Sequence, residues 1–356
     1  MIDGFLIKRL PPLLLASFRV GLCLLTIQIL WSPPVAAQTM PADLVTDGQP
    51  INLEQEKYQQ LFIELSQQHR FSPQELHDIF QGITINRPVL VLMDKQWEAK
   101  PYYQYAPLFI TKDNIQEGKE KLALHQKLLD RIEATFGVNR EVVVAIWGIE
   151  TRYGARQGKY DVLQTLNTLF DAYPRRSDFF RKQLIDYLLL CRETGINPKG
   201  VKGSYAAAFG QTQFIPSSFR DYSVSFDGDD KRDVWNSIPD ILASIANYLK
   251  RSNWTLDAPI YGELGYTLKD PQLVAAEAKG RKEKVPIDLV LGVQNPKLPP
   301  SPQNRPVTII GLELPPGGPF DKRFVAGYPN FQAITEWNHS NRYAMAVTEL
   351  AEALER

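Results

Sequence analysis

A single carboxylate follows the most apolar helical stretch of this chain. Residues 142–149 are all apolar or small, Glu150 comes next, and Gly154 marks the end of the segment. This pattern predicts a buried helix with one acid near its C-terminal end. Burial disfavours an ionised carboxyl, so the pKa of Glu150 should rise and the group could donate a proton near neutral pH. A structural acid paired with Arg152 or Arg156 is the alternative.

The composition limits the classes of protein that the chain can form. It has 356 residues, 44% hydrophobic and 22% charged, which is enough for one large domain or two to three small ones. Lys and Arg total 40, as do Asp and Glu, so no net charge indicates nucleic acid as a partner. The four histidines lack metal-ligand spacing, and the sequence has neither a nucleophile elbow nor a phosphate-binding loop.

The N-terminus has the three parts of a secretory signal. A basic end precedes apolar residues that continue to Trp31, and small residues at 35–37 offer a cleavage site. We therefore expect residues 1–37 to be a signal peptide that is removed after Ala37, so that the protein is exported. A retained membrane anchor is the alternative, because Arg19 divides a long apolar segment.

The two cysteines give little covalent support to the fold. Cys23 lies within the predicted signal, and Leu22 before it is a poor fit to the small residue that lipoprotein processing requires. An outer-membrane lipoprotein is therefore not expected. Cys191 would remain alone after cleavage and could form no internal disulfide. Its apolar neighbours predict a small core residue rather than a nucleophile.

The spacing of apolar residues, proline and glycine divides the rest of the chain. Helices are expected to begin at Ser72, to run unbroken over 114–136, and to begin again with Asn139 as cap, while a strand is expected at 307–312. The expected parts are a flexible lead at 38–52, a helical domain at 53–136, a core at 137–260, a small β-containing insert at 261–325 and a C-terminal segment at 326–356 that completes the core or helical domain.

Two further segments carry groups suited to a carbohydrate ligand. Small residues in 203–218 would let the backbone approach a ligand, and Ser204 and Gln213 can hydrogen-bond sugar hydroxyls or acetamido groups. Packed helices would need the same small residues, which is the alternative. Residues 337–347 place polar and aromatic groups before an apolar helix, where the pair at 340–341 could serve only as a helix cap.

The segment 225–233 alternates oxygen-bearing side chains in the manner of a calcium loop. Asp227 and Asp229 stand at ligand positions when Ser225 is taken as the first. Asp230 replaces the loop glycine, and two basic residues follow it. A solvated acidic turn therefore fits the segment better than a calcium site.

Several of these segments occur together, in the same order, in one known family. The segments are 148–154, 173–176, 203–206, 213–218, 246–248, 327–331 and 343–347. On them the chain resembles the lytic murein transglycosylases of the membrane-bound B type, enzymes that cleave bacterial peptidoglycan. The resemblance covers most of the chain from about residue 55 onward. It departs from the family at the pair 211–212 and in the calcium loop, where Ser225 replaces the usual acid.

The resemblance implies an α+β protein that is predominantly α-helical. It implies a lysozyme-like catalytic core at 137–260, an extra helical domain and a small β domain, with a periplasmic location. It also implies Glu150 as the sole catalytic acid and base. The residues implied in the saccharide cleft are Ser204, Gln213, Tyr248, Asn338 and Tyr343, with Tyr102 or Tyr103 from an aromatic cluster that matches the motif only loosely.

The activity implied is cleavage of the bond between N-acetylmuramic acid and N-acetylglucosamine, with 1,6-anhydro ends as product. Glycan strands would be the partner, other cell-wall enzymes are further candidates, a monomer is expected, and no cofactor is required. A hydrolytic muramidase is one alternative, with a second carboxylate hidden in 227–233. A non-catalytic peptidoglycan-binding protein is the other, although a pure binder would not need a buried acid.

Overall fold

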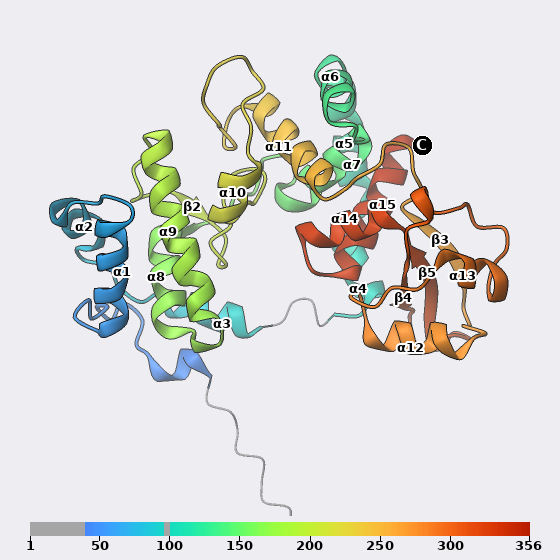
Figure 1. Ribbon diagram of the computed structural model, residues 1–356, viewed down its shortest axis with the longest axis horizontal. Coiled ribbons are helices and arrows are strands. Elements are labelled where there is room, and N and C mark those ends of the chain that lie inside the picture. The colour runs from blue at the N-terminus through green and yellow to red at the C-terminus, as the bar shows by residue number, and fades with distance from the viewer. Residues whose placement is uncertain (1–39, 96–99) are drawn as a thin grey trace, which may run out of the picture. The chain divides into compact units, whose positions relative to one another are not determined.

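The computed structural model describes residues 40–95 and 100–356, and it is mostly helical with two small antiparallel sheets (Figure 1). The predicted α+β, predominantly helical class is thus confirmed. The predicted signal peptide, residues 1–37, lies outside the described residues. Across the part that is described, no helix has both the length and the apolar character needed to span a membrane.

The N-terminal helices pack on two helices that follow much later in the chain. Tyr58 on α1 illustrates this, because its hydroxyl lies 3.3 Å from the side-chain oxygen of Asn167 and its ring lies 5.0 Å from Phe170. The helix α2 begins as predicted, with a capping box between Ser72 and Glu75. The elements of this group are α1 (Glu56–Gln67), α2 (Pro73–Phe80), α3 (Arg87–Asp94), α8 (Val162–Ala172), the 3-10 turn η4 (Pro174–Arg176) and α9 (Ser177–Thr194).

The segment before α1, predicted to be a flexible lead, makes contacts with the helical group from Met40 onward. A 3-10 helix, η1 (Pro41–Leu44), buries Ala42 and packs against α3. The backbone amide of Ile51 donates to the carbonyl of Ile83, 3.2 Å away. These contacts hold the segment because its few apolar residues complete a hydrophobic surface that α3 would otherwise expose.

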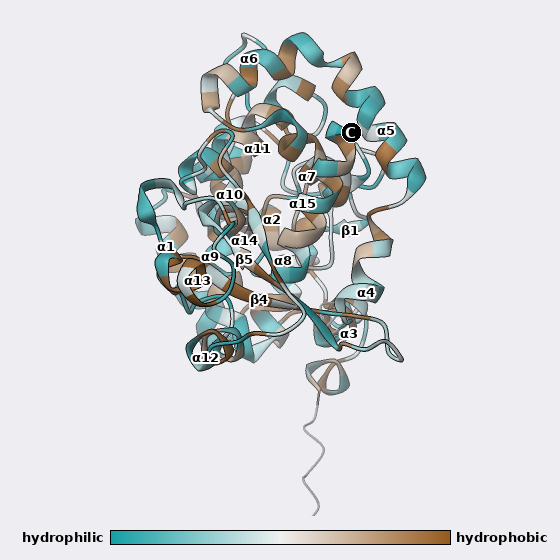
Figure 2. Cartoon of the chain, turned by 90° about the vertical axis from the view of Figure 1, so that its right-hand side faces the viewer, coloured by the Kyte–Doolittle hydropathy of each residue, from teal (hydrophilic) through white to brown (hydrophobic). Residues whose placement is uncertain are grey.

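The central helix of the second helical group is α7 (Arg140–Thr151), which has nine of its twelve residues buried. It packs against α5 (Lys112–Leu124), α6 (Gln126–Phe136), α11 (Ile238–Arg251) and α15 (Asn341–Glu355). The predicted single helix over 114–136 is two helices, because the backbone of His125, with ψ of 18°, leaves the helical region. Both α5 and α6 show alternating polar and apolar residues in Figure 2.

Asn139 stands at the start of α7 as predicted but does not cap it with its side chain. Its side-chain oxygen instead accepts a hydrogen bond from Trp254 at 3.1 Å, and its amide donates to Asp257. Thus the helices of the predicted domain 53–136 join two different groups: α1–α3 pack with α8 and α9, whereas α5 and α6 pack with α7.

The predicted insert contains a three-stranded antiparallel sheet with its own hydrophobic core. The strand expected at 307–312 is β4, displaced by one residue. The order in the sheet is β3-β5-β4, with β5 central. The elements are β3 (Tyr261–Gly265), α12 (Pro271–Lys279), α13 (Ile287–Val293), η5 (Pro302–Asn304), β4 (Thr308–Glu313) and β5 (Lys322–Gly327).

The remaining elements connect the two helical groups and the three-stranded sheet. A short two-stranded sheet joins the start of α8 to the small-residue segment that follows α9. They are α4 (Tyr102–Tyr105), η3 (Ala106–Leu108), β1 (Tyr160–Asp161), β2 (Lys202–Gly203), α10 (Pro216–Tyr222) and α14 (Pro329–Trp337).

Candidate active site

The chain turns sharply after Glu150, and the turn explains the motif around it. Arg152, Tyr153 and Gly154 all have positive φ, at 48°, 53° and 93°, a conformation that costs residues other than glycine on the order of 1 kcal/mol each. Tyr153 folds back over Gly148, where an added Cβ would lie 2.7 Å from its ring. Gly148, Tyr153 and Gly154 are all needed for this turn, so the turn accounts for the spacing of these residues in the motif.

A buried glutamine, Gln211, connects α7 to the loop that contains Trp235. The side-chain oxygen of Gln211 accepts a hydrogen bond from the indole of Trp147 on α7 at 2.8 Å. Its amide nitrogen donates to the carbonyl of Trp235 at 2.8 Å. The hydroxyl of Thr151, next to Glu150, lies 3.3 Å from the Gln211 carbonyl. The end of α7 that carries Glu150 is therefore held by a residue that lies 60 positions from Thr151 in sequence.

The carboxyl of Glu150 is hydrogen-bonded on one of its two oxygens. The hydroxyl of Tyr343 donates to Glu150 Oε1 at 2.6 Å. The indole N–H of Trp337 donates to the same oxygen at 2.9 Å. The described residues donate no hydrogen bond to Oε2. With both donors on Oε1, a proton on the carboxyl belongs on Oε2, which is left for an incoming group.

The surroundings of Glu150 keep its pKa in the range in which a carboxyl can act as a general acid. Burial raises the pKa of Glu150 from 4.5 to about 7, while the hydrogen bonds from Tyr343 and Trp337 oppose part of this rise. Burial and the neighbouring carboxyl raise the pKa of Tyr343 well above 10. Tyr343 and Trp337 therefore act only as donors at neutral pH, and Glu150 is the group that titrates.

A pocket of about 250 Å³ opens at Glu150, lined also by Phe109, Arg152 and Arg156. A larger cavity, of about 950 Å³, does not include Glu150. The smaller pocket is the candidate site because it contains a carboxyl whose pKa lies near neutrality. Arg152 and Arg156 line this pocket and form no ion pair with Glu150.

Aromatic rings pack behind Trp337. Tyr248, predicted as a cleft residue, lies 4.8 Å from the ring of Trp337 and 4.3 Å from that of Tyr222. Phe214 lies 5.1 Å from Trp337. The hydroxyl of Tyr248 donates to the carbonyl of Glu336 at 2.6 Å, which orients the ring. Because Tyr248 and Phe214 are buried and do not line the Glu150 pocket, these rings support the indole that binds Glu150.

The three other predicted cleft residues keep polar atoms for a ligand. Ser204 Oγ accepts from the amides of Ala206 and Ala208 and can still donate its own proton. Gln213, at a φ of 50°, donates to the Gly210 carbonyl at 2.9 Å, which leaves its side-chain oxygen as an acceptor. Asn338 follows α14 directly. Neither this oxygen nor the side-chain amide of Asn338 is hydrogen-bonded to a residue of the described chain.

Tyr102 and Tyr103, predicted as cleft residues, are not among the residues that line the Glu150 pocket, and Tyr102 is buried. Tyr102 is 7% exposed, and its hydroxyl donates to Glu349 at 2.7 Å. The hydroxyl of Tyr103 accepts a hydrogen bond from the side-chain amide of Gln104 at 3.0 Å. The same aromatic cluster instead contributes Phe109, which follows η3, to the Glu150 pocket. The sequence does not show which aromatic residue of the cluster reaches the pocket, because that depends on how α4 and η3 pack.

Sequence reasoning also missed Trp337, although the segment that contains it was singled out. The signal was present, since an indole N–H needs a partner when it is partly buried, and the predicted acid is a suitable acceptor. What the sequence does not show is that α14 ends beside the end of α7, across 187 positions of chain.

Asp227 and Asp229 are not arranged as metal ligands. Asp227 accepts from the Ser237 hydroxyl at 2.7 Å, and Asp229 accepts from the Lys231 amide at 2.7 Å. Among the residues that the structure describes, no three His, Cys, Asp or Glu side chains gather as a metal site. The residues present therefore do not fit a calcium ion.

A carboxyl that lines a pocket, has a pKa raised to about 7 and accepts two side-chain hydrogen bonds defines a candidate general acid–base site in a helical protein. The chain belongs to the Transglycosylase SLT domain family, which matches residues 54–352. The expected family and its lysozyme-like fold are thereby confirmed.

Three relatives illustrate the likeness. The chain is 33% identical over 306 residues to the membrane-bound lytic murein transglycosylase B of Escherichia coli K12, covering 83% of this chain and 82% of that protein. The lytic transglycosylase Slt35 of E. coli, solved in complex with calcium, is 31% identical, with 89% and 98% covered and a TM-score of 0.73. SltB3 of Pseudomonas aeruginosa, solved with NAG-NAM-pentapeptide, is 31% identical, with 84% and 79% covered and a TM-score of 0.71.

Proposed function

We propose that this protein is a lytic transglycosylase that cleaves the β-1,4 bond between N-acetylmuramic acid and N-acetylglucosamine in peptidoglycan and leaves 1,6-anhydro ends. The observation that carries the proposal is a lone carboxyl, that of Glu150, with a pKa of about 7 and both its hydrogen bonds on one oxygen. One group can then serve first as acid and later as base at the same pH.

The reaction follows from this geometry in two steps. Protonated Oε2 of Glu150 donates its proton to the glycosidic oxygen, the bond from that oxygen to C1 breaks, and the substrate's own acetamido oxygen stabilises the sugar cation. Ionised Glu150 then takes the proton of the C6 hydroxyl, and the C6 oxygen bonds to C1. No water is consumed, and Glu150 returns to its protonated form. Tyr343 and Trp337 hold the negative charge on Oε1 between the steps.

The surroundings of Glu150 give no support to a two-carboxylate hydrolase. A retaining or inverting glycosidase has a second carboxyl within about 5–9 Å of the first. Within residues 40–95 and 100–356, the pKa of Glu150 is shifted by burial, Tyr343 and Trp337, and no acid is among these causes. Asp227, Asp229 and Asp233 accept hydrogen bonds from backbone amides of their own loop instead.

The substrate proposed is a glycan strand that carries peptide stems, which the family relationship and the complex of SltB3 support. Ser204, Gln213 and Asn338 would hydrogen-bond its hydroxyl and acetamido groups, and Tyr248 would pack against a sugar ring. We also propose that the protein is exported to the periplasm after loss of residues 1–37, acts as a monomer and needs no cofactor, because Glu150 supplies both proton transfers.

The products of digestion test the proposal. Purified protein is incubated with peptidoglycan sacculi, and the soluble fragments are examined by mass spectrometry. We expect anhydro ends, which are lighter by one water than reducing ends. Reducing ends would mean a muramidase that uses water, and sedimentation of the protein with undegraded sacculi would mean a binding protein without activity. The Glu150→Gln variant, assayed in parallel, excludes a contaminating enzyme.

A further inference from the structure

The loop between α10 and α11, residues 225–237, is organised by hydrogen bonds to its own backbone. Asp227 Oδ1 accepts from the amide of Asp229 at 3.2 Å. Asp229 accepts from the amide of Lys231, and Asp233 from the amides of Trp235 and Asn236, at 2.7–2.9 Å. The carboxylates that a calcium ion would need as ligands are thus already used to form turns.

The positions that decide calcium binding in such a loop hold unsuitable groups. The hydroxyl of Ser225, at the first position, donates to the carbonyl of Asp229. The left-handed residue of the loop is Gly228, with a φ of 99°, at the fourth position rather than the sixth, where Asp230 stands. The twelfth position, which needs a bidentate glutamate, is Asn236, and its amide donates to Asp233 at 3.2 Å.

A buried acid beyond the loop closes it without a metal. Asp240, on the first turn of α11, is fully buried. One of its oxygens accepts from the amide of Phe226 at 2.7 Å and the other from the amide of Asp233 at 2.9 Å. Asp240 therefore joins the two ends of the loop, and both its oxygens are occupied.

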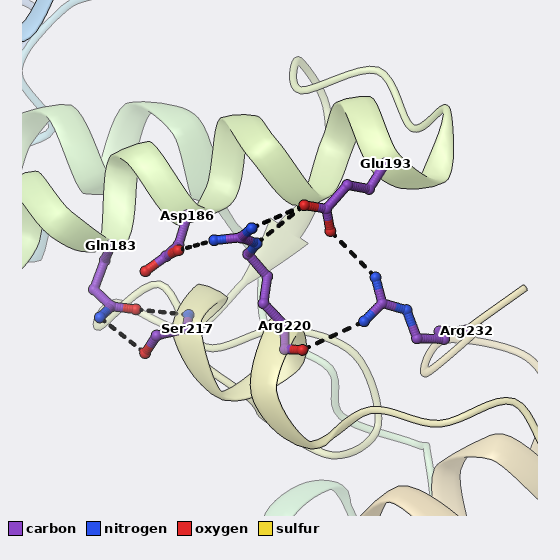
Figure 3. A network of polar contacts seen from close by, with 6 residues as sticks. All are labelled: Gln183, Asp186, Glu193, Ser217, Arg220 and Arg232. Carbon is purple, nitrogen blue, oxygen red and sulfur yellow. Dashed lines mark hydrogen bonds and ion pairs between the residues drawn. The ribbon is translucent and has the colours of Figure 1, made fainter. Parts of the chain in front are cut away.

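An arginine fastens the loop to the neighbouring helices (Figure 3). The guanidinium of Arg232 donates to Glu193 on α9 at 3.2 Å and to the carbonyl of Arg220 on α10 at 3.4 Å, and it lies 5.1 Å from the ring of Phe219. Arg220 binds the other oxygen of Glu193 at 2.9 Å and Asp186 at 2.5 Å. One cationic side chain of the loop thus enters a network of two arginines and two acids.

We propose that the loop 225–237 holds its shape without calcium and that the guanidinium of Arg232, bound to Glu193, does the fastening that a metal ion would do. The loop carries Trp235, whose carbonyl accepts from Gln211, and Gln211 binds Trp147 on the catalytic helix. The ion pair therefore supports the cleft from a distance. This inference does not depend on the reaction that the protein catalyses.

Calcium binding is the first test. Thermal unfolding of the purified protein is followed in EDTA and in millimolar calcium, at which weak extracellular calcium loops are occupied. We expect the same unfolding midpoint in both, and no heat of binding when calcium is titrated into the protein freed of metal. A midpoint raised by several degrees in calcium, and reversed by EDTA, would overturn the proposal, whatever the enzymatic activity.

A double-mutant cycle tests the fastening itself. Arg232→Gln and Glu193→Gln should each lower the midpoint by about 1–3 °C, and the two together by clearly less than the sum, since both break one network. The matched control is Arg70→Gln, at an exposed arginine that forms no ion pair within the described residues, which should leave the midpoint unchanged and add to Glu193→Gln. Additive losses for Arg232 and Glu193, or no loss for Arg232→Gln, would reject the role of the ion pair.

Discussion

The carboxyl of Glu150 and that of Asp227 lie in opposite surroundings, although both belong to segments that the sequence marks as acids of interest. Burial raises the pKa of Glu150 to about 7, and two side-chain donors share one of its oxygens. Asp227 is exposed, and the Ser237 hydroxyl and the Asp229 amide hold its pKa below its ordinary value. One acid is kept able to give a proton, and the other is kept ionised.

The difference shows that the groups bound to a carboxyl decide whether it can act as a general acid. The number of acids in a segment does not decide this. Four aspartates lie within 227–233, yet each that has a described contact binds backbone amides of its own loop. No acid of the described residues affects the pKa of Glu150, which lines a pocket. Chemistry is therefore expected only where a carboxyl keeps one oxygen unengaged in a partly dry site.

The largest effect should come from Glu150→Gln. The amide can neither donate the proton of an acid nor accept one as a base, so the release of soluble fragments from sacculi should fall by about 10³-fold or more. The fold should remain, since glutamine keeps the size of the side chain and an acceptor for Tyr343 and Trp337. Activity within tenfold of the unchanged protein would remove Glu150 from the mechanism.

The stability of the same variant checks the raised pKa separately. Because the pKa of Glu150 is higher in the folded protein than in the unfolded chain, its contribution to stability is full below pH 4.5 and is lost as the pH rises through about 7. At pH 8, Glu150→Gln should therefore unfold at a higher temperature than the unchanged protein, and at pH 4, below both pKa values, the difference should nearly vanish. Equal midpoints at both pH values would contradict the burial of the carboxyl.

Tyr343→Phe should have the next largest effect. It removes the 2.6 Å hydrogen bond that stabilises the ionised Glu150, and loss of a hydrogen bond to a charged group costs about 1.5–3 kcal/mol. We expect kcat to fall by about 10- to 100-fold and the high-pH limb of activity to move to higher pH. Tyr328→Phe, which removes a 2.6 Å hydrogen bond to Pro299 in the insert, is the matched control and should leave that limb in place.

Much of this fold could be predicted from the sequence, because apolar spacing and caps are local. The start of α2 at Ser72, the strand β4 and the acid at the end of α7 were all visible there. The break at His125 was not, since no residue there forbids a helix and ψ changes only where α5 and α6 take separate positions.

The site was predictable as far as it depends on motifs. Glu150 and Tyr343 came from the sequence and meet in the structure. Phe109 instead of Tyr102 at the pocket, and Trp337 at Glu150 Oε1, depend on how α4 and α14 pack. The side chain of Asn139 likewise left its own helix for Trp254, a contact across 115 positions. Long-range packing of this kind leaves no local pattern to detect.

Trp337→Phe should have a smaller effect than Tyr343→Phe, because its hydrogen bond to Glu150 is longer, at 2.9 Å. Phenylalanine keeps a ring against Tyr248 and Phe214 and removes only the N–H donor. We expect a loss in kcat of about 3- to 10-fold and a high-pH limb that again moves upward. Trp254→Phe, which loses an indole bond to Asn139, should not move the limb, and an unshifted limb for Trp337→Phe would mean that the indole only packs.

Asp227→Asn should have the smallest effect, and it tests the other half of the comparison. Asparagine keeps an oxygen for the Asp229 amide and can keep one contact with Ser237, so the turn should persist. Activity on sacculi should stay within about twofold of the unchanged protein, as for most surface substitutions. Asp270→Asn is the matched control, since that residue caps α12 by accepting from the Gln272 amide at 2.7 Å. If Asp227→Asn instead abolished activity while Asp270→Asn did not, a second carboxylate would be at work, and the single-acid mechanism would have to be replaced by hydrolysis.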